Sequence, residues 1–204
     1  MKIITVTTGL LAENAYILVS DDLSASVIID GGEKYEEIKR AAAATRAPVK
    51  AMLLTHAHYD HSGVSADFQK DGVPVYIGER DAEKVITGTG ACPFKSRFTP
   101  FTPDGLLKDG DKLVFGDVKL TVINTPGHTD GSVTFMAKNA LFTGDLLFRR
   151  SVGRTDFLSG DYDALVSSIK KLYALNGDYT VYAGHGEKTT LSEERRFNPY
   201  VKAE

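Results

Sequence analysis

The chain has 204 residues, with 24 Lys or Arg, 27 Asp or Glu and a formal net charge of −3. This length favours one domain over residues 1–204, large enough to bury a core without disulfides. The slightly acidic balance gives no electrostatic reason to expect a nucleic-acid or membrane partner. No stretch approaches the ~20 apolar residues of a membrane span, and Glu13 and Asn14 interrupt any signal-peptide core. With Cys92 as the single cysteine, we expect a cytoplasmic protein.

The first quarter of the chain predicts short strands around one helix. Runs of β-branched and other apolar residues favour strands at residues 3–6, 16–19 and 26–30. The apolar residues of segment 34–46 share one helical face, and Pro48 closes this helix. Residues 49–55 (VKAMLLT) then predict a buried strand that leads into a histidine cluster.

The middle of the chain predicts a strand at 73–77, a helix at 79–86 and then a long loop. Glycine and proline recur through residues 87–105, and loops of such length are often lids or binding loops. We expect a lid or insertion here, with a packed surface excursion as the alternative. Cys92 lies in this segment, and we expect it to be an ordinary small residue because no histidine is left to activate it.

The second half predicts two hairpins, an amphipathic helix and a terminal strand and helix. Gly-Asp at 116–117 joins strands within 112–122, and Lys-Asn at 138–139 joins 132–137 to 140–143. A helix is predicted at 162–176, a strand at 179–183, and a capping box from Thr190 to Glu193 opens the last helix. Strands in runs with helices between them favour sheets packed face to face and covered by helices.

Three of the five histidines of the chain fall within the segment THAHYDH, residues 55–61. Because side chains alternate along an extended strand end, His56 and His58 point the same way and can reach one metal ion. Asp60 and His61 lie beyond, where the chain must turn, and can reach a second ion. Imidazole and carboxylate ligands together suit zinc, iron or manganese.

The remaining histidines and one aspartate follow strand-like segments directly, each beside glycine. They are His128 in PGH, His185 in AGHG and Asp145 in FTGD. Glycine before a ligand lets the backbone turn sharply and approach an ion, and a loop held by a sheet is a common location for an active site.

THAHYDH, PGHTDGS, FTGD and AGHG together resemble the metallo-β-lactamase superfamily, in matching order along the chain. The resemblance implies an αββα sandwich of the α/β (α+β) class, with two packed mixed sheets flanked by helices and two metals at one edge. It assigns His56, His58 and His128 to the first metal, Asp60, His61 and His185 to the second, and Asp145 as the bridge. Asp60 and Asp145 are its catalytic carboxylates, and Asp30 matches an acid behind the ligands; the alternative for Asp30 is a turn-capping aspartate.

The stretches FTGDLLF and VGRTDF are similar to the short forms of hydroxyacylglutathione hydrolase (glyoxalase II), and persulfide dioxygenases share GRTDF. The resemblance implies hydrolysis of a small-molecule thioester of the S-lactoylglutathione type by a hydroxide shared between two divalent ions, with zinc favoured over iron or manganese. Arg154 occupies the position of a substrate-binding lysine, but Asp156 and Glu187 replace two tyrosines of the family. We also expect no C-terminal glutathione-binding helical domain. Glutathione as the thiol is therefore open.

Two alternatives remain from the sequence. The first is a persulfide dioxygenase with one iron held by His56, His128 and Asp145. The second is a lactonase or phosphodiesterase on the same fold. Arg149 and Arg150 are candidates for selecting an anionic substrate, and a solvated basic turn is their alternative. The oligomeric state cannot be read from the sequence.

Overall fold

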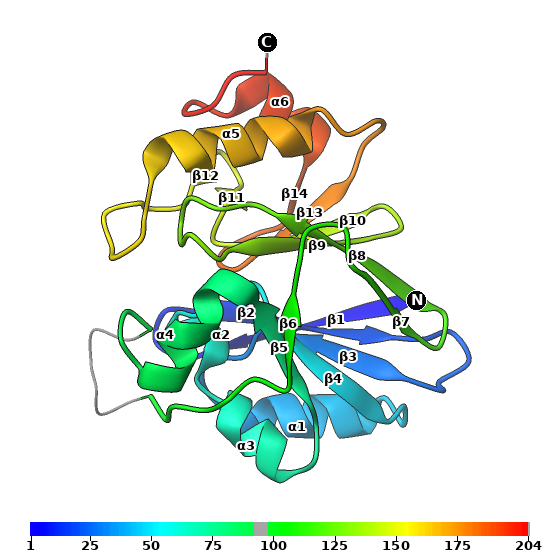
Figure 1. Ribbon diagram of the computed structural model, residues 1–204. Helices are drawn as coiled ribbons and strands as arrows, with labels where there is room; N and C mark the ends of the chain where they lie inside the picture. Colours follow the sequence, from blue (N-terminus) through cyan, green and yellow to red (C-terminus); the bar gives the residue numbers. More distant parts are fainter. Residues whose placement is uncertain (92–97, 204) are drawn as a thin grey trace.

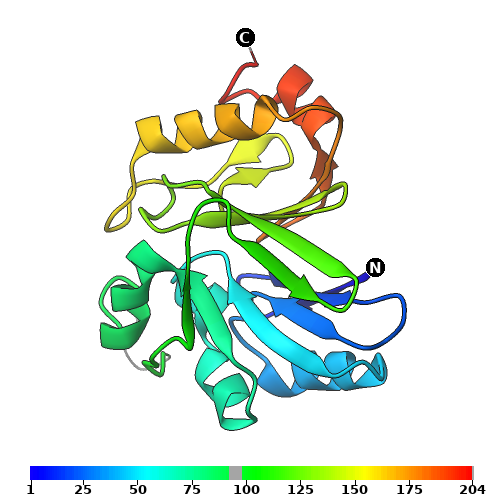
Figure 2. The ribbon, with the colours of Figure 1, turned by 45° about the vertical axis from the view of Figure 1, so that its right-hand side comes forward.

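Two six-stranded β-sheets lie face to face with helices on their outer faces in the computed structural model, which describes residues 1–91 and 98–203. Figure 1 shows the four layers, with α1 and α3 below the lower sheet and α5 and α6 above the upper one. The turned view in Figure 2 keeps the same order of layers. The predicted αββα sandwich is thus the architecture of the described chain.

The lower sheet is formed by the N-terminal half of the chain, in the order β1-β2-β3-β4-β5-β6. Its first two pairings are antiparallel and its last three are parallel. The strands are β1 (Lys2–Thr8), β2 (Glu13–Val19), β3 (Ser26–Ile29), β4 (Val49–Leu54), β5 (Val75–Gly78) and β6 (Gly105–Leu107).

The upper sheet has the order β14-β13-β10-β9-β8-β7, and only its β10–β13 pairing is parallel among the described strands. A separate two-stranded hairpin, β11 with β12, follows β10 in the chain. The strands are β7 (Lys112–Phe115), β8 (Val118–Asn124), β9 (Val133–Ala137), β10 (Ala140–Gly144), β11 (Leu147–Phe148), β12 (Ser151–Val152), β13 (Thr180–Ala183) and β14 (Thr189–Thr190).

Two of the helices begin at side-chain caps. Asp161 accepts a hydrogen bond from the Ala164 backbone N–H at the start of α5, and Thr190 accepts one from Glu193 at the start of α6. No helix in the described ranges is long and apolar enough to cross a membrane. The helices are α1 (Tyr35–Ala44), α2 (Tyr59–Ser62), α3 (Ser65–Lys70), the 3₁₀ turn η1 (Glu79–Asp81), α4 (Ala82–Thr87), α5 (Tyr162–Tyr173) and α6 (Leu191–Phe197).

The alternation of side chains along the central strands separates the core into layers. On β2, Ile17 packs toward the lower helices, whereas its neighbours Tyr16 and Leu18 pack between the two sheets. Phe135 and Phe142 of the upper sheet fill the same central layer and are fully buried. Because both faces of the inner strands are covered, β2 and β3 are buried along their whole length.

The predicted strands, hairpins and longer helices are confirmed, and the shortest elements were missed. Helices α2 and α3, strand β6 and the β11–β12 hairpin carry too few residues to show a periodic pattern. The described ends of the predicted 87–105 lid pack inward, since Ala91, Phe98 and Phe101 are buried in the lower core. The lid function stays a prediction, and Cys92 lies outside the described residues.

Candidate metal centre

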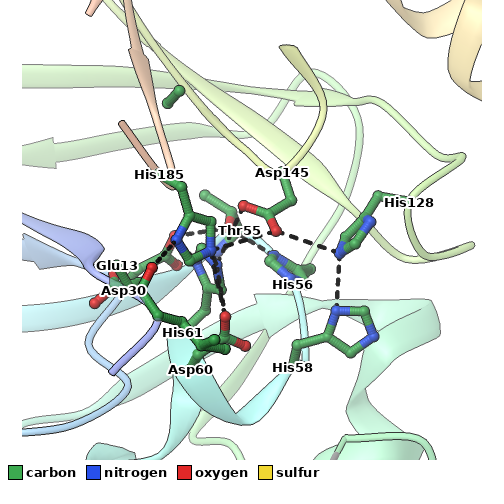
Figure 3. A network of polar contacts seen from close by, with 12 residues as sticks. Glu13, Asp30, Thr55, His56, His58, Asp60, His61, His128, Asp145 and His185 are labelled. Atoms are coloured by element: carbon green, nitrogen blue, oxygen red, sulfur yellow. Dashed lines mark hydrogen bonds and ion pairs between the residues drawn. The ribbon is translucent and has the colours of Figure 1, made fainter. Parts of the chain in front are cut away.

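Five chain segments converge at one edge of the two sheets and carry the predicted ligands. His56 follows β4, His128 lies between β8 and β9, Asp145 follows β10 and His185 follows β13. The remaining three ligands lie at the start of α2 or within it. Figure 3 shows that all seven side chains point toward one another from both sheets. The structure therefore brings together every ligand that the sequence predicted.

The first ligand group consists of His56, His58 and His128, whose nearest ring nitrogens all lie within 4.8 Å of one another. His58 Nδ1 and His128 Nε2 are 2.8 Å apart. His56 Nε2 is buried and has no hydrogen-bond partner among the described residues. A buried polar atom without a partner is costly, and a metal ion coordinated by all three rings would satisfy it.

The second ligand group consists of Asp60, His61 and His185, also within 4.8 Å. His185 Nε2 lies 3.3 Å from His61 Nε2 and 3.3 Å from Asp60 Oδ2. Asp145 stands between the groups, because its carboxylate oxygens lie 3.3 Å from His61 Nε2 and 3.6 Å from His128 Nε2. This is the position that a bridging carboxylate requires.

Asp30 lies on the side of the histidine rings away from the pocket and is linked to two of them. Its carboxylate accepts hydrogen bonds from the Thr55 backbone N–H and hydroxyl, each 2.7 Å long, and His61 Nδ1 lies 2.9 Å away. The Thr55 hydroxyl is also 3.0 Å from His56 Nδ1. A carboxylate that accepts a hydrogen bond from the Nδ1–H group leaves Nε2 free for a metal and raises the basicity of Nε2. Asp30 thus contacts the candidate ligand His61 directly and His56 through Thr55, behind the ligands as the resemblance implied.

Backbone carbonyls orient two further ligands. His128 Nδ1 lies 2.7 Å from the Arg154 carbonyl oxygen, and His185 Nδ1 lies 2.9 Å from that of Leu11. A carbonyl oxygen can only accept a hydrogen bond, so Nδ1 carries the proton in both rings and Nε2 faces the centre. The sequence could not reveal these contacts, since every residue has a carbonyl.

Glycines keep the space around the ligands open. A Cβ atom on Gly184 would lie 2.3 Å from Asp145 Oδ1 and 2.5 Å from His61 Cε1. A Cβ atom on Gly32 would lie 1.7 Å from the Asp60 carbonyl oxygen. Both distances are far inside van der Waals contact, so only glycine lets these backbones approach the ligand turn so closely. The seven donor side chains, the unpaired His56 Nε2 atom and the space left by these glycines fit two divalent metal ions.

Burial and the neighbouring charges set the protonation of the rings. Burial lowers the pKa of His56 and lowers that of His58 to about 3, so both rings are neutral and ready to coordinate. For His61 burial also acts to lower the pKa, but the carboxylates of Asp145, Asp30 and Asp60 raise it well above its ordinary value. A proton on His61 therefore compensates the clustered carboxylates until a metal replaces it.

Two buried carboxyl groups behind the centre were missed in the sequence. Glu13 is 1% exposed beside Asp30 and His61, and burial raises its pKa well above the ordinary value. Asp81 is fully buried, and its Oδ2 atom accepts hydrogen bonds from the Ala57 backbone N–H and the Thr129 hydroxyl, both 2.8 Å long. Asp81 thus ties the histidine turn of the lower sheet to the His128 loop of the upper sheet.

The side chain of Arg154 is engaged within its own loop. Its Nε and Nη2 atoms each donate a 2.7 Å hydrogen bond to the Asp156 carboxylate, and its guanidinium carbon lies 3.8 Å from the centroid of the Phe157 ring. Arg149 and Arg150 form ion pairs with glutamates on the surface. The three arginines that were candidates for binding an anionic substrate are therefore already paired.

Comparisons with known proteins agree with this geometry. Residues 8–185 match the metallo-beta-lactamase superfamily. The chain belongs to this superfamily. Hydroxyacylglutathione hydrolase GloC of Haemophilus influenzae is 34% identical over all of this chain and 98% of its own length.

Two solved structures share the fold closely. The BLEG-1 B3 metallo-beta-lactamase superposes with a TM-score of 0.86 at 33% identity, covering 98% of this chain and 99% of its own. TTHA1623 in a di-iron-bound form gives a TM-score of 0.85 at 36% identity, covering 97% of this chain and 100% of its own. The protein is thus a metal-dependent hydrolase by family, with a His/Asp cluster that can hold metal.

Proposed function

We infer that the protein hydrolyses small-molecule thioesters, in the manner of the hydroxyacylglutathione hydrolase that it resembles at 34% identity. The observation that carries this proposal is a pair of ligand groups joined by Asp145 at the wall of a pocket of about 630 Å³. A pocket of this size admits a small thioester with its carbonyl at the ligand cluster. Zinc is the proposed metal, and the proposed setting is the cytoplasm, without a nucleic-acid or membrane partner.

Two divalent ions held by the seven ligands would lower the pKa of a water molecule to about 7 and polarise the thioester carbonyl. Asp60 is largely buried beside them, and although burial raises its pKa, the neighbouring His61 and His185 lower the pKa by more. Asp60 is therefore a carboxylate at neutral pH, able to accept the proton of the attacking water. A thiolate is a good leaving group, so the reaction requires little general-acid assistance.

The deciding experiment measures thiol release from S-lactoylglutathione and from simpler thioesters by the zinc-loaded protein. Asp145→Ala removes the carboxylate shared by both groups, so activity and metal content should be lost together. Asp163→Ala, an exposed aspartate in the first turn of α5, is the matched control and should change neither. An Asp145→Ala protein that keeps two metals and full activity would exclude the proposed role of Asp145.

Two competing reactions have support in specific observations. His56, His128 and Asp145 lie together and could hold the single iron of a persulfide dioxygenase. The similarity to the BLEG-1 B3 metallo-beta-lactamase makes β-lactam hydrolysis the other competitor. Oxygen uptake with a persulfide by the iron-loaded protein, or nitrocefin cleavage by the zinc-loaded protein, each without thioester hydrolysis, would replace the proposal.

A further inference from the structure

The part of the active-site pocket that lies beyond the metal ligands is mostly apolar. Five of the seven candidate ligands form one wall of the pocket. The remaining side chains of the lining that bear on substrate binding are Leu11, Tyr59, Ala91, Arg154, Phe157 and Leu158. They come from the β1–β2 turn, the start of α2, the segment after α4 and the loop before α5. Separate parts of the chain therefore converge to place apolar surface beside the reacting atoms.

Three of these apolar side chains are exposed rather than packed into the core. Leu11 is 51%, Phe157 40% and Leu158 65% exposed. A large apolar side chain gains nothing from such exposure, and a cluster of them rimming a pocket marks a binding surface. The neighbouring Leu10, 80% exposed, extends the same apolar turn outward. We call Leu11, Phe157 and Leu158 the apolar rim.

The positive side chain of the described lining is already paired with a carboxylate. Among residues 1–91 and 98–203, Arg154 is the one lysine or arginine in the pocket wall. The Asp156 carboxylate occupies its Nε–Nη2 edge, and its flat face covers the Phe157 ring. A substrate carboxylate would have to displace Asp156 from that edge or share a guanidinium whose charge Asp156 already balances. The described lining thus favours an uncharged group over an anionic one.

We propose that the site selects thioesters in which an apolar chain of several carbons flanks the scissile carbonyl, on the acyl or the thiol side. The inference rests on the proposed thioester hydrolysis and adds the substrate class. The carbonyl lies at the ligand cluster, and the chain lies against the apolar rim. Burying one methylene group there should raise kcat/KM about threefold to fourfold.

The test uses the full-length zinc-loaded protein and two series of thioesters, followed by thiol release. In the first series the thiol is uncharged N-acetylcysteamine and the acyl group is acetyl, butanoyl, hexanoyl or octanoyl. In the second the acyl group is acetyl and the thiol is a propyl, pentyl or heptyl thiol. A rise of kcat/KM with chain length in either series supports the proposal and identifies the side of the thioester that contacts the rim.

The possible results distinguish a failure of the apolar selection from a failure of the proposed thioester hydrolysis. Thioester hydrolysis that is independent of chain length in both series, with S-lactoylglutathione as the best substrate, would overturn the apolar selection and leave thioester hydrolysis standing. No hydrolysis of any thioester by fully metal-loaded protein would overturn the proposed function, and the inference with it.

Variants of the apolar rim test whether its side chains cause the dependence of kcat/KM on chain length. Leu158→Ser should reduce the gain in kcat/KM from the acetyl ester to the longest effective chain by about tenfold. Val114→Ser is the matched control, because Val114 is 61% exposed on β7 and does not line the pocket. Leu158→Lys supplies an unpaired cation and should shift the preference toward the glutathione thioester. Equal losses for short and long substrates in Leu158→Ser would show that the rim does not contact the chain.

Discussion

Replacement of Asp81 by alanine tests whether one buried carboxylate joins the two halves of the centre. Asp81 is fully buried and accepts hydrogen bonds from the Ala57 backbone N–H and the Thr129 hydroxyl. Its other oxygen lies 2.8 Å from the Lys84 ammonium. In Asp81→Ala the Ala57 N–H loses its acceptor, whereas the Thr129 hydroxyl still has the Ser132 hydroxyl 2.7 Å away. Lys84 keeps its ion pair with Asp130.

The size of the effect on stability follows from the Ala57 N–H, the donor to Asp81 that is left without an acceptor. A buried donor left without an acceptor costs about 1–3 kcal/mol, so the free energy of unfolding should fall by about that amount. Asp81→Asn retains an acceptor oxygen for both donors and should lose less. Because the loops of His58 and His128 are no longer tied together, Asp81→Ala should also bind zinc more weakly.

Urea unfolding followed by circular dichroism, with chelator and with excess zinc, measures the two effects separately. Asp67→Ala is the matched control, because Asp67 forms an i,i+3 ion pair with Lys70 on the exposed face of α3. That pair should contribute less than about 1 kcal/mol. If Asp81→Ala were as stable as Asp67→Ala and bound zinc like the unaltered protein, the proposed tie between the two loops would be refuted.

Three further predictions concern the ligand network and one helix cap. Asp30→Asn removes the charge behind His61 and should weaken zinc binding about 10–100-fold in competition with a chromophoric chelator; unchanged affinity would contradict the role of Asp30. Because carboxylates hold the pKa of His61 well above its ordinary value, zinc must displace a proton there, so affinity should fall as pH falls. Titration calorimetry in two buffers counts the released protons, and Asp30→Asn, which lowers the His61 pKa, should release fewer at neutral pH. Asp161→Ala removes the acceptor for the Ala164 N–H and should lower the free energy of unfolding by about 0.5–2 kcal/mol, while Asp161→Asn, which retains an acceptor, should stay close to the unaltered protein.

The sequence alone indicated which residues form the candidate centre and which layers surround it. The seven ligands could be predicted because metal binding needs imidazole and carboxylate groups, and few residue types supply them. The helix at 162–176 and the strand at 49–55 were readable because burial on one face or both leaves a periodic or continuous apolar pattern over enough residues. These features depend on the identity of each residue and its near neighbours in the chain.

Other features were decided only by the tertiary structure. The carbonyls of Arg154 and Leu11 orient ligands through an atom common to all residues, so their identity carries no signal. Asp81 resembles any aspartate before a helix until the fold brings Ala57 and Thr129 to it across the two sheets. The Arg154 side chain, expected to bind substrate, is paired two residues away with Asp156, and its contacts depend on the conformation of the loop. Contacts between residues far apart in the chain are set by packing of the sheets, which no local pattern of side chains records.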